Sequence, residues 1–241
     1  MAAAKHRIWE LDAFRGVAIL AVIVIHLLFD LEYFLGISLG YENPVFQFVK
    51  QYGGVVFVVL SGTCVTLGSR SVRRGLIVFG CAMAVTLVTY GMVWLGLDSG
   101  SIVVKFGVLH LLGLCMLLWP LFRRLPTWAL LAIGIPVVAL GYWFATFHVA
   151  SSWLFPLGLT SASFTSSDFF PLFPHLGWFL LGAVLGRTVY KDKKTRLPQV
   201  HEKAAPVRFF CWCGRMSMFL YLFHQPVLYG LTMAGLWLFG R

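Results

Sequence analysis

The sequence LDAFRGVAILAVIVIHLLFDLEYF, residues 11–34, decides the fold class of this chain. It is long and apolar enough to form a helix across a bilayer, which takes about 20 predominantly apolar residues. The same stretch nevertheless contains Arg15, His26 and Asp30. Ionisable side chains inside a membrane span are costly and by default mark functional sites. This one stretch therefore predicts both a membrane protein and the location of its site.

The composition of the remaining chain extends the prediction. Of its 241 residues, 59% are hydrophobic and 12% are charged, whereas soluble domains average about 45–50% apolar and 25% charged residues. We therefore predict an all-α integral membrane protein, a bundle of about seven transmembrane helices that forms a single domain over residues 1–241. The expected spans are residues 14–35, 45–68, 75–97, 102–121, 127–147, 172–190 and 215–238.

The positions of the basic residues predict the orientation of these spans. Cytoplasmic loops of membrane proteins carry an excess of Lys and Arg. If the N-terminus is cytoplasmic, all but three of the 19 Lys and Arg, including Lys5 and Arg7, fall on the inner side. We therefore expect a multi-pass protein of the plasma (inner) membrane with its C-terminus outside. The net charge of +10 then reflects orientation rather than nucleic-acid binding. The three basic residues left on the outer side are Lys50, Lys105 and Arg241.

The ionisable residues of the first span share one face. At about 100° per residue, positions eleven apart come almost full circle, so Arg15 and His26 lie on the same side, with Asp12 near them. His26 and Asp30 are separated by four residues and are neighbours on a helix. A carboxylate beside an imidazole can orient it as a general base. His26 and Asp30 are therefore the candidate catalytic residues.

Polar residues in three later spans are candidates for substrate-binding or supporting roles. In the last span, Pro226 removes a backbone donor next to a polar cluster, and such breaks usually line a cavity or site. The fourth span carries a histidine between two glycines, and the sixth carries one near its outer end. Cys211 and Cys213 form only a weak metal-binding signal, and we predict no metal site. The substrate-binding or supporting candidates are His110, His175, Tyr221, His224 and Gln225.

Four segments together resemble the bacterial branch of the heparan-α-glucosaminide N-acetyltransferase family. They occur in the expected order, and the resemblance extends over residues 8–239. Compared with the lysosomal enzyme, the chain is short and lacks a luminal domain and additional spans. The four segments are LDAFRGVAILAVIVIH (11–26), FGVLH (106–110), FPHLGWFLLGAVLGR (173–187) and RMSMFLYLFHQPVL (215–228).

The resemblance implies an acyl-CoA-dependent N- or O-acyltransferase. In the family, an acetyl or other acyl group comes from acyl-CoA on the cytoplasmic side and reaches an amino or hydroxyl group, typically of a sugar, on the other side. In related cell-surface acyltransferases, the residue at the position of His26 is the proposed catalytic group, and the one at the position of Arg15 is linked to CoA. Arginine also suits bidentate phosphate contacts. The candidate cofactor-binding residues are Arg15, Arg73, Arg74 and Arg215.

Two other functions stay open from the sequence. Intramembrane His and Asp residues are typical of proton relays, so a solute or proton transporter or channel is the main alternative. Four histidines on spans also allow a haem-binding electron carrier. For the acyltransferase we expect acyl-CoA and a carbohydrate-like acceptor as binding partners, together with membrane lipids, and a homo-oligomer is possible. We expect no nucleic-acid partner.

Overall fold

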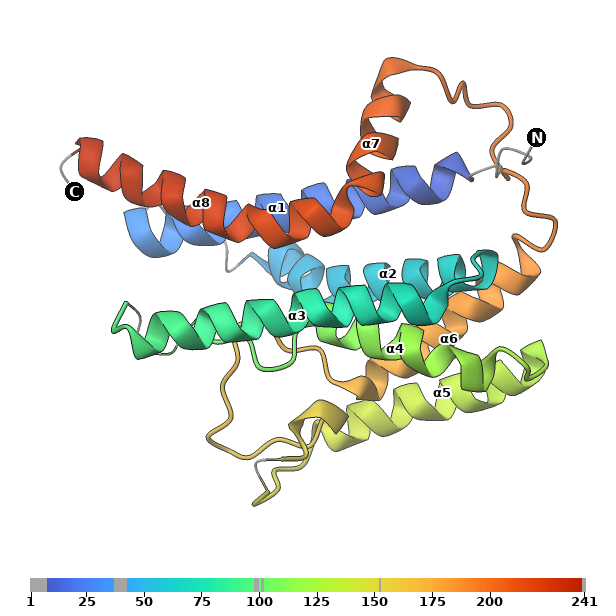
Figure 1. Ribbon diagram of the computed structural model, residues 1–241, viewed down its shortest axis with the longest axis horizontal. Helices are drawn as coiled ribbons and strands as arrows, with labels where there is room; N and C mark the ends of the chain where they lie inside the picture. The colour runs from blue at the N-terminus through green and yellow to red at the C-terminus, as the bar shows by residue number, and fades with distance from the viewer. Residues whose placement is uncertain (1–7, 37–42, 98–99, 101, 152, 240–241) are drawn as a thin grey trace. The chain divides into compact units, whose positions relative to one another are not determined.

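The computed structural model describes residues 8–36, 43–97, 100, 102–151 and 153–239 (Figure 1). Lys5, Arg7 and Arg241 of the charge pattern lie outside these residues, as does the side chain of Lys50. The described chain is built from α-helices with one short 3-10 turn, Phe155–Leu157, which confirms the predicted all-α class. The helices are α1 (Trp9–Leu35), α2 (Pro44–Leu67), α3 (Ser71–Trp94), α4 (Val108–Phe122), α5 (Thr127–Phe144), α6 (Leu172–Thr188), α7 (Ala205–Arg215) and α8 (Ser217–Phe239).

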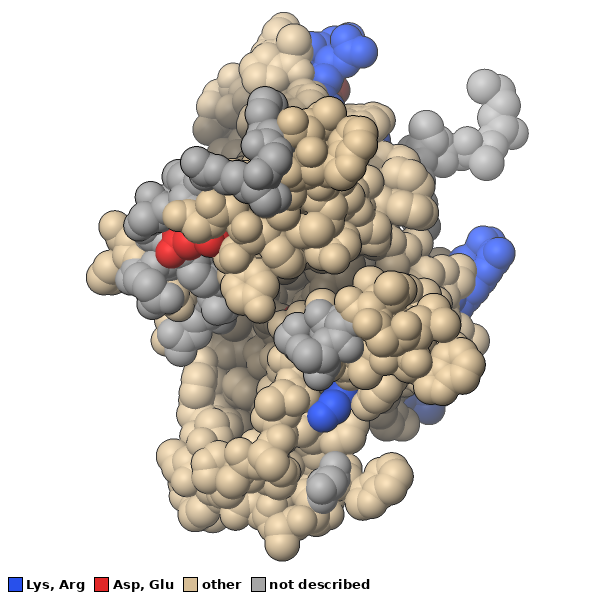
Figure 2. Space-filling model, turned by 90° about the vertical axis from the view of Figure 1, so that its left-hand side faces the viewer, with Lys and Arg blue, Asp and Glu red and all other residues tan. Residues whose placement is uncertain are grey.

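Several of these helices have the length and apolar character that a bilayer requires. Within the described residues, four qualify on both counts: α1, α2 over Gln47–Leu67, α3 and α5. The apolar helix α4 is shorter, and α6 and α8 are not among the four. Most of the described side chains visible in Figure 2, which views the left-hand side of Figure 1, are uncharged. Along the helices, many large apolar side chains are exposed; exposed apolar surface marks contact surfaces, and here it fits contact with lipid. Examples are Leu87, Trp94, Leu121, Trp128 and Trp237.

Two segments differ from the sequence prediction. The fourth span was expected from residue 102, but α4 begins only at Val108. The residues before it are extended, because Val103 and Phe106 accept backbone hydrogen bonds from Ser167 and Phe170. Hydropathy cannot distinguish an apolar extended segment from a helix. The second difference is α7, a separate helix that ends just before α8, where the prediction had a loop and then a span from residue 215.

Contacts divide the chain into two compact units. Unit 1 contains residues 1–57 and 192–241, and unit 2 contains residues 58–191. In unit 1, α8 lies beside α1 and the two run in the same direction (Figure 1). The helix α7 packs against the first half of α1, where Gly16 faces the carbonyl of Phe210 and Gly214 faces the carbonyl of Asp12. These glycines let the two backbones touch, because a Cβ at either position would overlap the opposite carbonyl oxygen.

Unit 2 is built from antiparallel helix pairs, α3 with α4 and α5 with α6. Its apolar core centres on the fully buried Leu111, Leu130, Phe179 and Leu180. The second half of α2 packs against α6, and Gly62 lies directly against the carbonyl of Phe179. The segment 148–171 between α5 and α6 also packs against this core through its phenylalanines, so it is part of the fold. The phenylalanines concerned are Phe155, Phe169 and Phe170.

We expect the contact between α1 and α7 to be sensitive to a single methyl group. Gly16→Ala should destabilise the protein by about 1–3 kcal/mol, because the added Cβ is forced into the backbone of α7. Gly230→Ala in α8 is the matched control, since its Cβ would meet nothing within 4 Å. That change should be neutral or stabilising by up to about 1 kcal/mol. Thermal unfolding in detergent tests this pair, and equal Tm values for the two variants would contradict it.

Candidate functional site

A buried carboxylate joins α1 to α8. Asp30 has no exposed surface, and the side-chain amide of Gln225 donates to both of its oxygens, at 3.2 and 3.4 Å. A charged group inside a membrane protein needs such a partner, because an unpaired one is costly to bury. The contact unites two residues that the sequence singled out separately, one in the first span and one in the last.

Two histidines meet one helical turn away from this carboxylate. The rings of His26 and His224 are 4.8 Å apart between centroids and are arranged edge to face, with 81° between their planes. The ring of Tyr221 lies 5.3 Å from that of His224. The sequence analysis predicted five catalytic or supporting residues on the first and last spans, not counting the arginines. All five lie at or next to one contact between α1 and α8. These are His26, Asp30, Tyr221, His224 and Gln225.

Backbone carbonyls set the proton positions on both rings. The Nδ1 atom of His26 lies 2.8 Å from the carbonyl oxygen of Val22, and that of His224 lies 2.6 Å from the carbonyl oxygen of Tyr221. Because a carbonyl only accepts hydrogen bonds, Nδ1 carries the proton in each ring. In the neutral form, Nε2 is then the atom with the lone pair. The carbonyl of Val22, rather than Asp30, therefore fixes the tautomer of His26.

Two acceptor atoms at this contact have no partner. Among the described residues, His224 Nε2 and Gln225 Oε1 are buried without a hydrogen bond. A buried polar atom left unsatisfied typically costs about 1–3 kcal/mol. His224 and Gln225 both face α1, where they meet His26 and Asp30. A ligand that carries hydrogen-bond donors, such as an amine or a hydroxyl group, would satisfy both atoms.

The other two candidate histidines lie in unit 2. His110 is 3% exposed; its Nδ1 accepts from the Gly107 amide at 3.1 Å, and its Nε2 lies 3.1 Å from the hydroxyl of Thr86. That hydroxyl donates to Val104, so it accepts from His110. Both ring nitrogens of His110 are therefore engaged: Nδ1 caps the start of α4, and Nε2 ties α4 to α3. The Nδ1 of His175 donates to the carbonyl of Pro171 at 2.8 Å.

The four candidate arginines fall in two places. In unit 1, Arg15 pairs with Asp12 at 3.4 Å, and Arg215 is the last residue of α7. In unit 2, Arg73 and Arg74 are exposed in the first turn of α3. The guanidinium of Arg74 lies against Gly68, which lines a small pocket of about 260 Å³. Arg123 and Arg187 also line this pocket.

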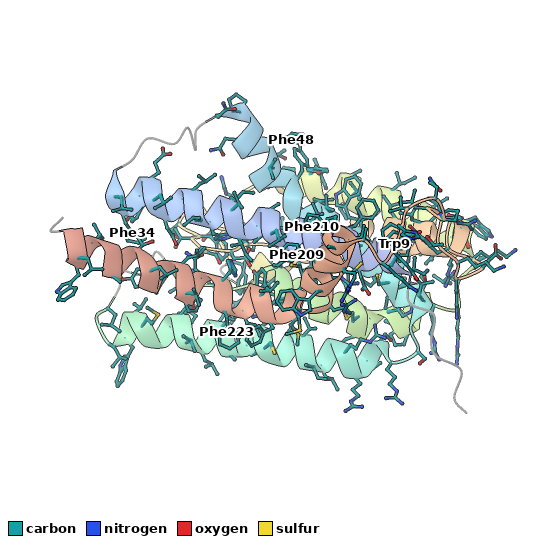
Figure 3. The ribbon with its side chains drawn as sticks, turned by 90° about the horizontal axis from the view of Figure 1, so that it is seen from above. Trp9, Phe34, Phe48, Phe209, Phe210 and Phe223 are labelled. Atoms are coloured by element: carbon teal, nitrogen blue, oxygen red, sulfur yellow. The ribbon has the colours of Figure 1, made fainter. Side chains whose placement is uncertain are left out.

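A larger pocket in unit 1 was not predicted from the sequence. It has a volume of about 670 Å³ and lies along the exposed face of α7; we call it the α7 pocket. Figure 3 shows Trp9 near the start of α1, and Phe209 and Phe210 on α7. The strong amphipathic pattern of APVRFFCWCGR, residues 205–215, was the available signal. The residues that give the pocket its character are Trp9, Lys203, Arg208, Phe209, Trp212 and Arg215.

The described residues contain no cluster suited to a metal ion. No group of three or more His, Cys, Asp or Glu side chains comes together in them. Cys211 and Cys213 are buried free thiols of α7, and the Cys211 thiol donates to the carbonyl of Trp9 on α1 at 3.3 Å. They therefore act as packing residues at this contact.

An all-α membrane protein with two imidazoles and a carboxylate at one helix contact has the groups that proton-transfer catalysis requires. Compared with known protein families, residues 7–226 match the family described as heparan-alpha-glucosaminide N-acetyltransferase, catalytic. The chain belongs to this family, which confirms the resemblance found in the sequence. Membership implies a transmembrane acetyltransferase. No curated protein and no solved structure matches the chain.

We expect the thiols of α7 to resist alkylation in the native protein. Burial raises the pKa of both Cys211 and Cys213; for Cys211 the carboxylates of Asp12 and Glu202 act in the same direction, against an opposing effect of Arg215. A raised pKa leaves less thiolate, which is the reactive form, at any given pH. Near the ordinary thiol pKa of about 8.5, iodoacetamide should therefore label both residues much more slowly than in the denatured chain. Equal rates in the two states, measured by mass spectrometry, would contradict this.

Proposed function

We propose that this protein transfers an acetyl or other acyl group from cytoplasmic acyl-CoA to an amino or hydroxyl group of a carbohydrate acceptor at the outer side of the plasma membrane. The observation that carries the proposal is the contact of His26 and Asp30 with His224 and Gln225 inside a chain of this acetyltransferase family. Family membership supports acyl transfer, and the contact supplies the groups for it.

In the proposed reaction, His26 is the general base. Its Nε2 takes the proton from the hydroxyl or amino group of the acceptor as the acceptor oxygen or nitrogen attacks the thioester carbonyl carbon. The carbon–sulfur bond then breaks, and the leaving thiolate recovers a proton from the imidazolium. The charge of Asp30, one turn away, stabilises that imidazolium electrostatically. His224 Nε2 and Gln225 Oε1 accept hydrogen bonds from the acceptor and hold it beside His26.

Arginines are proposed to hold the phosphates of CoA at the cytoplasmic end. Guanidinium groups match phosphate oxygens in bidentate geometry. Arg15 lies on α1 eleven residues before His26, which corresponds to about 16 Å along the helix axis. Arg215 lines the α7 pocket near the same end of α1. Arg73 and Arg74, in the first turn of α3, belong to unit 2 and stay predictions from the sequence.

The directions of neighbouring helices support the proposed membrane orientation. With seven crossings and a cytoplasmic N-terminus, the first and last spans both run outward, and α1 and α8 are indeed parallel (Figure 1). Consecutive spans should run in opposite directions, as α3 and α4 do, and likewise α5 and α6. The second and sixth spans both run inward in this scheme, and α2 and α6 are parallel where they pack in unit 2.

Removal of the proposed base tests the function directly. His26→Ala should lower kcat for acetyl transfer to an amino-sugar panel by about 10²–10⁴-fold, the usual contribution of general-base catalysis. His201→Ala, on the exposed loop before α7, is the matched control and should leave the rate unchanged. CoA release by purified protein gives the readout. Absence of acyl-CoA binding by the wild-type protein in calorimetry would rule out the proposal.

A double-mutant cycle tests whether Asp30 and Gln225 act as a pair. Gln225→Leu removes the amide that donates to the buried carboxylate, so it should cost about 1–3 kcal/mol of stability and slow transfer. Asp30→Asn removes the charge itself. Residues that share a hydrogen bond are typically coupled by about 0.5–3 kcal/mol, so the double variant should lose less than the sum of the single changes. Additive losses in both stability and rate would show that the contact has no energetic role.

A further inference from the structure

The α7 pocket carries positive charge that the described residues do not neutralise. Lys203, Arg208 and Arg215 line it and have no ion pair in the part of the chain that the structure describes. Two carboxylates also line it, but Asp12 already pairs with Arg15, which leaves Glu202. Basic groups around a concave surface attract an anion, and arginine is particularly suited to phosphate.

The same pocket presents flat aromatic surfaces. Trp9 contributes from α1 and Phe209 from α7 (Figure 3). Trp212 of α7 also lines the pocket, and Phe209 and Trp212 are 51% and 50% exposed. An aromatic face stacks on a nucleic-acid base by about 1–3 kcal/mol. The volume of about 670 Å³ also falls within the usual range for small-molecule sites, about 300–1,000 Å³. Stacking surfaces and free cations together describe a site for a nucleotide.

Packing holds this surface open. Phe210 and Gly214 of α7 lie directly against the backbone of α1 at Gly16, whereas Arg208, Phe209, Trp212 and Arg215 are exposed. The loop that carries Glu202 and Lys203 is also fixed at its other end. Glu10, which is 1% exposed, accepts hydrogen bonds from the hydroxyl of Thr195 and the backbone N–H of Arg196. Both walls of the pocket are therefore attached to the first turns of α1.

We infer that the α7 pocket binds the adenosine bisphosphate end of coenzyme A. This inference rests on the proposed function for the identity of the nucleotide. The adenine ring stacks against Trp212 and Trp9, and Lys203 and Arg208 contact the phosphates together with Arg215. From there the acyl-bearing arm extends along α1 toward His26. Trp9, Lys203, Arg208 and Trp212 thus become binding residues that the sequence pattern did not indicate.

Binding of a CoA fragment tests this site without any turnover. Adenosine 3′,5′-bisphosphate, which lacks the acyl-bearing arm, should bind the purified full-length protein in calorimetry. Arg208→Gln and Trp212→Leu should each weaken its binding by about tenfold or more, since each removes a charge-assisted bond or a stacking surface. Lys203→Gln, on the exposed loop, should act in the same direction without any risk to the fold. Lys194→Gln is the matched control, because Lys194 is exposed on the same loop outside the pocket.

Kinetics with two donors separate the nucleotide site from the chemistry. With acetyl-CoA, the Arg208 and Trp212 variants should show KM raised by about tenfold and kcat nearly unchanged. With acetyl-pantetheine, which has no nucleotide, the variants and the wild type should react alike. A structural defect would instead lower kcat with both donors.

The outcomes distinguish this inference from the proposed function. If all three pocket variants bind adenosine 3′,5′-bisphosphate as tightly as the wild-type protein does, the inference is overturned, whatever the enzyme activity. A second result would also overturn the inference: the pocket binds the nucleotide no more tightly than inorganic phosphate, and phosphatidylglycerol displaces the nucleotide. That result would identify the pocket as a site for a lipid headgroup. If nucleotide binding depends on the pocket residues but no acyl transfer occurs, the site stands and the proposed function fails.

Discussion

The hydrogen bonds between Gln225 and Asp30 are the interaction on which unit 1 depends. A carboxylate in a helix of membrane-spanning length needs a partner, and this one finds an amide on α8, the long helix beside it. The pair fixes the register of α8 along α1. With that register set, His26 meets His224 one turn earlier and Phe34 meets Tyr229 one turn later, at 5.6 Å between ring centroids. The site is thus a consequence of one polar contact.

The helix α1 connects the two functional regions of unit 1. Its first turns hold α7 through glycine contacts and form one wall of the α7 pocket. Its second half presents His26 and Asp30 to α8. Because a helix is stiff and advances by about 1.5 Å per residue, the distance between the pocket and the imidazole pair is fixed. A substrate with a charged end and a reactive end separated by a long arm matches such an arrangement.

The sequence identified the polar residues that meet where α1 contacts α8, but it missed several helix boundaries. Ionisable residues in an apolar stretch stand out, so His26, Asp30, His224 and Gln225 were identified before their contact was known. Their pairing across helices was not predictable, since helical periodicity describes one helix at a time. The structural role of His110 was not predicted either, because it depends on hydrogen bonds with Thr86 of another helix and with Gly107. The helix α7 was missed because it has only 11 residues and carries Arg208 and Arg215, so a search for long apolar segments passes over it.

The division of unit 1 between the two ends of the chain has a consequence for its biosynthesis. Asp30 and Gln225 are 195 residues apart in sequence, and unit 2 is translated between them. At about 5–20 residues per second, the amide emerges roughly 10–40 s after the carboxylate. Glu10 likewise has no hydrogen bond from the Arg196 backbone until a further 186 residues have been translated. During this interval α1 must remain inserted with its ionisable face unmatched. The first helix therefore has to be apolar enough to stay in the bilayer alone, and the long run of aliphatic residues between Arg15 and His26 provides that margin.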